Sequence, residues 1–400
     1  MPLTSERTAG FGESVIRRMT RIANEHGAIN LSQGFPDFEP PEELKRALAA
    51  AATKGPHQYA ITWGAANFRA ALAEKQRRFM GIPIDPEKNI TVTCGSTEAM
   101  MAAMMSVINP GDRVVVFSPF YENYGADAIL SGAEPVYVPL VPPDFAFDRD
   151  TLRRAFELRP RALILCNSSN PSGKVFTRSE LEYIAGLAEE FDTWVITDEV
   201  YEHIVYDGAA GVRHIYFASL PGMSKRTISC SSLSKTYSIT GWRLGYTIAC
   251  EAATDIIRKV HDFLTVGAAA PLMEAAVTAL AFPQSYYDSL LASYTKKRDV
   301  FLGALDRAGL RYTRPRGAYY VLADIGEFYD RDDTLFCEWL AKEVKVAAVP
   351  GSSFFRESVT NMIRFHFAKK EETLIAAGER LAGLRAIWAE KGDALGRAEK

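Results

Sequence analysis

Lys235 lies in a segment whose side chains could build a covalent cofactor site. Ser232 and Ser234 precede the lysine, Arg243 follows it, and glycines stand on both sides of the arginine. Lysine amines form Schiff bases with carbonyl groups, while hydroxyl donors and a fixed cation are groups that hold a phosphate. A lone lysine is usually a solvated surface charge. The prediction of a site for a cofactor with a carbonyl and a phosphate therefore depends on these neighbours.

Small or polar residues also follow three other apolar runs that we expect to be strands. The turn Gly95-Ser96-Thr97 follows the first, Asn170 lies shortly after the second, and Asp198 ends the third with Tyr201 close behind. Ligands bind at the carboxyl ends of strands in open parallel sheets, so we expect these residues to meet near the lysine. A structural interpretation stays open for each: a helix cap for the glycine turn and the aspartate, and a plain turn for the asparagine.

The segment 232–245 resembles the lysine signature of the class I/II aminotransferases, which depend on pyridoxal 5'-phosphate (PLP). The resemblance runs from about residue 28 to residue 370, which is almost the whole chain. It implies that Lys235 binds PLP as a Schiff base. The phosphate ligands that it implies are Gly95, Ser96, Thr97, Ser232 and Arg243. It also matches Tyr59 to a tyrosine that reaches the phosphate of the partner subunit, which implies a homodimer with shared active sites.

The same resemblance assigns contacts to the PLP ring. It implies that Asp198 keeps the ring nitrogen protonated, and that Tyr201 and Asn170 bind the phenolic oxygen. Tyr121 matches the residue that stacks on the ring, although an aromatic residue after a strand is more often part of a core. Asn170 is also implied to contact the substrate carboxylate.

Arg364 is the residue that the resemblance implies for binding the α-carboxylate of the substrate, through two parallel hydrogen bonds. It lies in an alternating run, 361–367, whose pattern puts Ile363 and Phe365 on one face and Arg364 on the other. By pattern alone, that second face could equally be a solvated strand face. Gly34 matches a backbone position near the same carboxylate.

Composition excludes several classes of protein. The chain has 400 residues and a net charge of −3, so we expect no binding of nucleic acid or of anionic membrane. Its apolar stretches are too short to span a membrane, and residues 1–12 lack the apolar core of a secretory signal. Five widely spaced cysteines suit free thiols in a reducing cytoplasm. No metal-ligand spacing of cysteine or histidine is present, so we expect no metal site.

The pattern of apolar runs predicts an α/β fold: a large domain with a mostly parallel seven-stranded sheet covered by helices, and a smaller α+β domain. The expected strands of the large sheet are 90–94, 113–117, 134–138, 162–166, 193–197, 227–230 and 245–249. The expected helices include 67–79, 98–108, 179–191, with Ser179 as its cap, and 271–280. We assign residues 46–285 to the large domain, and residues 1–45, packed as an arm, with 286–400 to the small one. Within the small domain we expect a long helix over 286–308 and strands at 318–323, 344–349 and 362–367.

These features predict ping-pong transfer of an amino group from an amino acid to a 2-oxo acid. The stretch 33–38 most resembles the branch that acts on kynurenine, glutamine, methionine and aromatic amino acids. Three alternatives stay open. They are an aspartate-type aminotransferase, a β-lyase acting on cysteine conjugates, and a non-catalytic PLP sensor domain. We place no second arginine for a dicarboxylate side chain, which argues weakly against a strict aspartate enzyme.

Overall fold

The large sheet carries most of the site. The computed structural model describes residues 12–206, 214–392 and 395, and eight strands of this part of the chain form one sheet in the order β2-β9-β8-β7-β6-β3-β4-β5. The strands are β2 (Ile90–Thr93), β3 (Arg113–Ser118), β4 (Glu134–Val141), β5 (Ala146–Phe147), β6 (Ala162–Cys166), β7 (Trp194–Asp198), β8 (Thr227–Ser232) and β9 (Gly245–Ile248). β4, β3, β6, β7 and β8 run parallel, while β9 is antiparallel to β8 and to β2. The α/β class and the mostly parallel sheet are therefore confirmed.

Helices cover both faces of this sheet because its strands are apolar on both sides. Val116 and Ile164 point to one face and pack with helices α4 (Ser96–Val107), α5 (Asn123–Leu130) and α8 (Glu251–Thr265). Val115 and Leu163 point to the other face and pack with α6 (Arg149–Glu157) and α7 (Arg178–Glu190). This double burial explains why the strands read as continuous apolar runs rather than alternating ones.

Two details of the prediction were wrong. The sheet has eight strands instead of seven, because the two-residue strand β5 pairs antiparallel with the end of β4. A strand this short carries no periodic pattern. Helix α7 is capped by Thr177 and not by Ser179: the Thr177 hydroxyl accepts from the backbone of Glu180, whose carboxylate accepts from the backbone of Thr177 in return.

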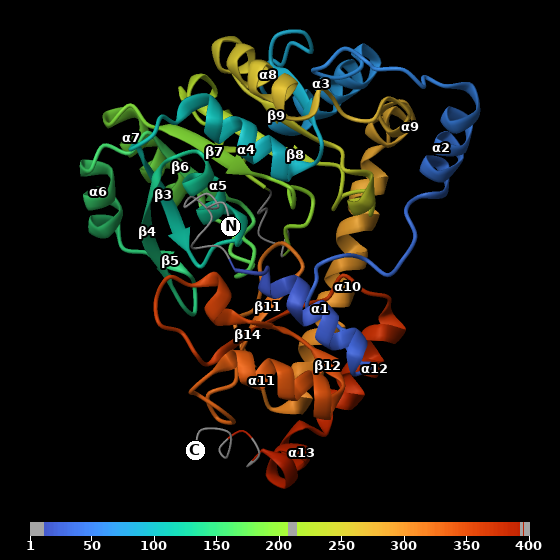
Figure 1. Ribbon diagram of the computed structural model, residues 1–400, viewed down its shortest axis with the longest axis vertical. Coiled ribbons are helices and arrows are strands. Elements are labelled where there is room, and N and C mark those ends of the chain that lie inside the picture. Colours follow the sequence, from blue (N-terminus) through green and yellow to red (C-terminus); the bar gives the residue numbers. More distant parts are fainter. Residues whose placement is uncertain (1–11, 207–213, 393–394, 396–400) are drawn as a thin grey trace, which may run out of the picture.

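A second group of strands lies below the large sheet (Figure 1). Its four-stranded sheet has the order β10-β11-β14-β13, formed by β10 (Arg311–Tyr312), β11 (Tyr320–Asp324), β14 (Met362–His366) and β13 (Val349–Pro350). β1 (Ile29–Asn30) pairs in parallel with β12 (Val346–Ala347) beside it. The helices around these strands are α1 (Val15–Glu25), α11 (Asp333–Trp339), α12 (Glu371–Ala382) and α13 (Leu384–Lys391).

Helix α1 joins this second group through an apolar face. Ile16, Met19 and Ala23 recur at helical spacing and are buried, and α1 contacts α11, β12 and β13. Residues 12–45 contribute no strand to the large sheet, as expected. Helix α2 (Glu42–Lys54) instead packs against α9 (Ala270–Leu280), which also contacts α3 (Ala66–Met80) on the large-sheet side.

The two predicted domain boundaries both fall inside helices. Residues 45 and 46 lie in α2, and residues 285 and 286 lie in α10 (Gln284–Ala308), which runs alongside both sheets in Figure 1. The division into 46–285 and 1–45 with 286–400 stays a prediction. Within the described ranges, no helix is both long and apolar enough to cross a membrane.

Candidate active site

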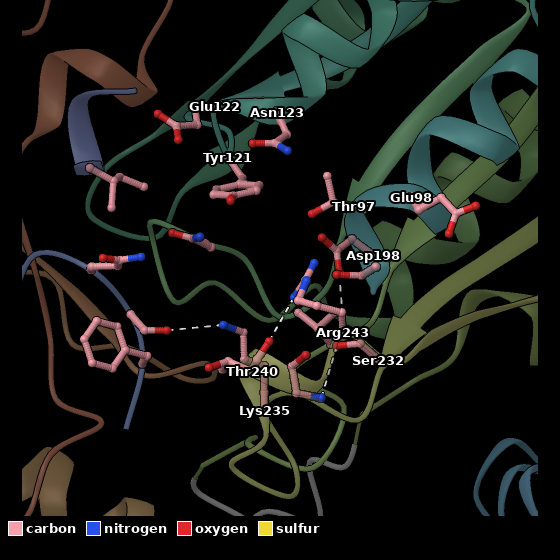
Figure 2. A pocket seen from close by; sticks show the side chains of 18 of the residues that line it. Thr97, Glu98, Tyr121, Glu122, Asn123, Asp198, Ser232, Lys235, Thr240 and Arg243 are labelled. Atoms are coloured by element: carbon pink, nitrogen blue, oxygen red, sulfur yellow. Dashed lines mark hydrogen bonds between the residues drawn. The ribbon is translucent and has the colours of Figure 1, made fainter. Parts of the chain in front are cut away.

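A cavity of about 830 Å³ opens at the edge of the large sheet that faces the second group of strands. Figure 2 shows Tyr121, Asp198 and Lys235 on different sides of this space. The predicted site residues that line it are Gly34, Ser96, Thr97, Tyr121, Asn170, Asp198, Tyr201, Ser232, Lys235, Arg243 and Arg364. Residues far apart in the sequence thus meet in one cavity, as the strand-end argument requires.

The strand register explains how the residues around Lys235 meet. Ser232 at the end of β8 pairs with Gly245 at the start of β9, which also pairs with Thr93 at the end of β2. Because β9 runs against its neighbours, Arg243 enters at the same edge where β2 and β8 leave. The glycine turn, the lysine and the arginine therefore share one edge of the sheet.

Lys235 lies in the cavity wall on the loop after β8. Its amine donates to the carbonyl oxygen of Gly34 at 3.2 Å and lies 5.7 Å from the centre of the Tyr319 ring. Burial lowers the pKa of this amine to about 8, with Arg243 and Arg364 acting in the same direction, while the charge of Asp198 opposes them. With a pKa of about 8, roughly a tenth of this amine is neutral at pH 7, against less than about one in a thousand for an ordinary lysine, which makes it a competent nucleophile and base.

Gly95 and Arg243 form a cup at the start of α4. Gly95 has a φ of 85°, and a Cβ atom there would collide with the guanidinium of Arg243. Arg243 itself adopts a left-handed backbone, with φ 53°, and donates to the Thr240 carbonyl at 3.1 Å. A cation held against the free backbone N–H groups of a helix start is a site for a phosphate. Gly95 shapes this cup without lining the cavity.

Asp198 ends β7 and is buried. The Tyr124 hydroxyl donates to its Oδ2 at 2.6 Å, and the Val200 amide donates to its Oδ1 at 3.3 Å. Burial raises the pKa of the carboxyl above its ordinary value, although these donors and the charge of Lys235 oppose that rise. None of the ion pairs found among the described residues includes Asp198. A buried carboxylate of this kind fits the protonated ring nitrogen of PLP.

Arg364 lies on β14 and is 1% exposed, so the solvated strand face that its alternation allowed is wrong. Its Nη1 donates to the Asn170 side chain at 2.7 Å and its Nη2 donates to the Ser32 carbonyl at 2.8 Å, whereas its Nε has no partner. The rings of Tyr320 and Phe354 lie 4.3 and 4.5 Å from the guanidinium. A buried guanidinium with a free donor beside a cavity fits a carboxylate ligand.

Tyr121 and Tyr201 line the part of the cavity near Asp198, where the PLP ring is expected. The Tyr201 hydroxyl lies 3.0 Å from the Tyr320 hydroxyl, and Tyr121 meets Tyr124 edge-on at 5.9 Å between ring centres. Tyr59 is the predicted residue that the structure leaves apart: it does not line the cavity and is 89% exposed. The expected contact of Tyr59 with a partner subunit stays a prediction.

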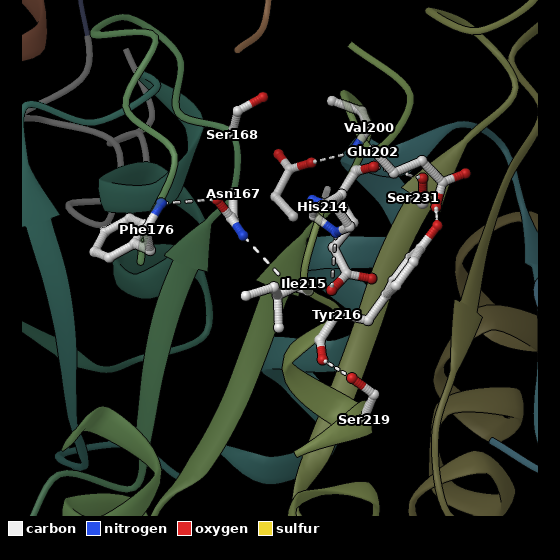
Figure 3. Close-up of polar contacts among 12 residues, drawn as sticks. Asn167, Ser168, Phe176, Val200, Glu202, His214, Ile215, Tyr216, Ser219 and Ser231 are labelled. Carbon is white, nitrogen blue, oxygen red and sulfur yellow. Dashed lines mark hydrogen bonds and ion pairs between the residues drawn. The ribbon is translucent and has the colours of Figure 1, made fainter. Parts of the chain in front are cut away.

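A buried polar cluster lies behind the turn that carries Asp198 and Tyr201. Glu202 accepts hydrogen bonds from Lys75 at 2.6 Å, from Tyr216 at 2.9 Å and from Gln76 at 3.1 Å. In Figure 3 the hydroxyl of Tyr216 points toward Glu202. None of these side chains lines the cavity, so the bonds hold Glu202, and with it the turn, from outside the cavity.

Several cavity residues were missed. Tyr124 lies in the first turn of α5, which was not among the expected helices. Tyr320 and the Ser32 carbonyl carry no local signal, since only the pairing of β11 with β14 and the path of the chain after β1 bring them to Arg364. Ser14, which caps α1, and Arg17 of α1 also line the cavity. Within the described ranges, no group of three acidic, histidine or cysteine residues could hold a metal ion.

Known proteins resemble the chain along nearly its whole length. The family model "Aminotransferase class I and II" matches residues 26–381. Methionine aminotransferase of Escherichia coli is 37% identical over 94% of this chain and 96% of the relative. Human kynurenine–oxoglutarate transaminase 3 is 33% identical over 94% of this chain and 89% of the relative. The structure of N-succinyldiaminopimelate aminotransferase from Mycobacterium tuberculosis superposes with a TM-score of 0.92 at 37% identity, covering 96% of this chain and all of that one.

Proposed function

The chain belongs to the aminotransferases of class I and II, and on this premise we propose that Lys235 carries its PLP. As a member of this family, the protein transfers an amino group from an amino acid to a 2-oxo acid and depends on PLP. The observation that carries the assignment is the convergence of Lys235, Asp198 and Arg364 on one cavity. They supply an amine, a buried carboxylate and a buried guanidinium.

The residues divide into three tasks. When bound, PLP supplies a ring that stabilises negative charge at the α-carbon of the substrate. Asp198 would keep the nitrogen of that ring protonated, and the Tyr124 hydroxyl favours the ionised form of Asp198 against the effect of burial. Arg364 and Asn170 orient the α-carboxylate, while the cup of Gly95–Thr97, Ser232 and Arg243 holds the phosphate.

Lys235 has a second task once the amino acid has taken its place on the cofactor. In its neutral form this amine, with a pKa of about 8, would accept the proton that leaves the α-carbon and would deliver it to the aldehyde carbon of PLP. A protonated amine with an ordinary lysine pKa could not accept this proton near neutral pH. Tyr121, Tyr201 and Tyr320 wall this space, which limits the access of water to the reacting carbon.

We propose donors with aromatic, methionine-like or glutamine-like side chains. Similarity to a methionine aminotransferase and to kynurenine transaminases supports this choice. A panel of amino donors against 2-oxoglutarate and pyruvate tests it. Fastest turnover with aspartate would favour an aspartate-type enzyme, and release of pyruvate and thiol from a cysteine conjugate without an acceptor would favour β-elimination.

We also propose a cytoplasmic homodimer in which Tyr59 reaches the partner's site. Exposed apolar side chains cluster in two segments near the cavity, where a partner subunit would cover them: Tyr59, Ile61, Phe263, Leu264 and Val266. Leu264 lines the cavity itself. The cysteines described are free thiols, which suits a reducing compartment. Molecular mass in solution tests the dimer, and mixing Tyr59→Phe with Lys235→Ala protein tests the sharing of sites.

The Lys235→Ala variant tests the central assignment. Wild-type protein should be yellow with bound PLP, and the variant should retain no covalent PLP and no transamination. Lys259→Ala, which removes an exposed lysine from α8, is the matched control and should behave as wild type. Full transamination by Lys235→Ala would refute the proposal.

A further inference from the structure

His261 lies directly beneath the proposed phosphate cup. It is on α8 and is fully buried. Its Nδ1 lies 2.6 Å from Oε1 of Glu98, and its Nε2 lies 2.8 Å from the carbonyl oxygen of Thr62. Both ring nitrogens of one histidine therefore face oxygen atoms of different segments of the chain.

The partners of His261 decide where its protons are. A carbonyl oxygen can only accept, so Nε2 carries a proton. At the other nitrogen, Oε1 of Glu98 already accepts from the Thr265 hydroxyl at 2.9 Å, and Oε2 accepts from the backbone amide of Cys94. These donors suit an ionised carboxylate, and an ionised carboxylate requires a proton on Nδ1. The geometry thus describes an imidazolium paired with a carboxylate.

The charges near His261 agree with this protonation. Burial alone would lower the pKa of His261, but the hydrogen bond and charge of Glu98 and the Thr62 carbonyl raise it above its ordinary value. Burial likewise opposes ionisation of Glu98, yet the hydrogen bonds from His261 and Cys94 lower the pKa of Glu98. Asp262 on the same helix adds a smaller favourable charge. Arg258, one turn earlier, donates to the carbonyls of Glu87 and Ile90.

Glu98 connects this histidine to the phosphate cup. It sits in the first turn of α4, immediately after Gly95, Ser96 and Thr97, and holds the amide of Cys94, immediately before them. The Glu98 carboxylate therefore links the residues before and after this turn. His261 holds that carboxylate in place. Through the Thr62 carbonyl, the same imidazole ties the turn to the segment that carries Tyr59.

We propose that His261 is a positioning residue, held as an imidazolium, that fixes the phosphate-binding turn against the segment around Thr62. This inference rests on the proposed function, because the turn must bind the phosphate of PLP. Glu98 and His261 touch neither the reacting carbon nor the substrate carboxylate in this role. Their effect reaches the cofactor through the backbone of the turn.

Release of two cofactors separates this role from general support of the fold. In His261→Asn, the shorter amide cannot reach both partners, and PLP release should accelerate by about tenfold or more. Release of pyridoxal, which lacks the phosphate but still bonds to Lys235, should change by less than about twofold. Asp262→Asn, which removes the neighbouring charge without touching the turn, should leave both release rates unchanged.

Each result decides between the two proposals. Unchanged PLP release in His261→Asn would overturn the positioning role, as would equal acceleration for PLP and pyridoxal. Failure of the wild-type protein to bind PLP at Lys235 would instead overturn the proposed function, on which this inference rests.

Nitrogen NMR of histidine-labelled protein tests the charge without relying on His261→Asn. We expect both ring nitrogens of His261 to carry protons at a pH of about 6.5, the ordinary pKa of histidine, at which an unperturbed imidazole is half neutral. Glu98→Gln keeps an acceptor for the Cys94 amide and supplies a donor to Nδ1, so His261 should become neutral in the same place. A neutral His261 in the wild type, or an imidazolium that persists in Glu98→Gln, would overturn the ion pair.

Discussion

The Nη1 atom of Arg364 donates to the side-chain oxygen of Asn170 at 2.7 Å, although Arg364 lies in the four-stranded sheet and Asn170 in a loop of the large one. Arg364 is on β14, while Asn170 follows β6 of the large sheet. The proposed carboxylate site therefore spans the two sheets. Binding of a substrate carboxylate here would couple the relative position of the sheets to substrate recognition.

Replacement of Arg364 tests the carboxylate site. Lysine keeps the charge but cannot make two parallel hydrogen bonds, so Arg364→Lys should lower kcat/KM for the amino donor by about tenfold or more. PLP retention, followed by visible absorption, should stay at the wild-type level. Arg153→Lys, at an exposed pair with Glu190, is the control. An equal loss of PLP would assign Arg364 to the fold instead of the substrate.

The Tyr124 hydroxyl should contribute to turnover, although no sequence pattern indicated Tyr124 as a site residue. It donates to Asp198 at 2.6 Å and opposes the rise in the pKa of that carboxyl that burial causes. Tyr124→Phe removes a hydrogen bond to a charged group, so kcat should fall about tenfold while the protein still binds PLP. Tyr183→Phe, which removes a surface hydroxyl bonded to Arg149, should not change kcat. Wild-type turnover by Tyr124→Phe would show that Asp198 needs no such donor.

Capture of cofactor by the apoprotein should depend on pH through Lys235. Only the neutral amine attacks a carbonyl, and burial lowers the pKa of this amine to about 8. The capture rate should therefore rise with pH and level off above about 8, whereas an ordinary lysine with a pKa of about 10.4 would give a rate that keeps rising. Using pyridoxal as the probe excludes ionisation of the phosphate. A rate still rising near pH 10 would contradict the lowered pKa.

Comparison of alanine substitutions at two glycines distinguishes the effect of backbone strain from the effect of a collision in the phosphate cup. Gly95 and Gly81 both have positive φ values, 85° and 69°, but a Cβ at Gly95 meets Arg243 while one at Gly81 meets nothing within 4 Å. Gly95→Ala should therefore accelerate PLP release, and Gly81→Ala should only reduce stability, by about 1 kcal/mol. Equal effects on PLP release would remove Gly95 from the cup.

The ion pair between Lys75 and Glu202 should be important for stability. Their charged atoms lie 2.6 Å apart, and both side chains are almost fully buried. Lys75→Met leaves the carboxylate buried without its cation, which should cost about 3–5 kcal/mol of unfolding free energy in a denaturant titration. Lys296→Met, at an exposed pair with Glu371, should cost at most about 1 kcal/mol. The double variant Lys75→Met with Glu202→Gln should recover part of the loss.

The large sheet and most of the candidate site could be predicted from the sequence because both depend on local patterns. Continuous apolar runs marked the strands, and the polar residues after them had to meet once the strands ran parallel. Arg364 was assigned by resemblance alone, since its alternating run equally allowed a solvated face. Its burial depends on Tyr320 and Phe354, which only the folded chain brings to it.

Other features had no local signal. The bond from His261 to Thr62 joins segments that neither periodicity nor spacing relates, so no local pattern indicates the position of this histidine. The cap of α7, by contrast, did have a local signal, although Ser179 was predicted where Thr177 is found. The sequence held the correct capping box, but two hydroxyl residues competed for the position.

The pairing of β1 with β12 has a consequence for how the chain is made. Ile29 pairs with Val346, so an early segment of the polypeptide finds its partner strand only after most of the remaining chain has been synthesised. During translation, the large sheet can assemble before β12 has been made. Until then, the apolar face of helix α1 has no partner to cover it. Closure of this long loop then comes late, since non-local contacts cost the most chain entropy. We therefore expect the residues after 346 to set the moment at which the nascent enzyme acquires a complete active site.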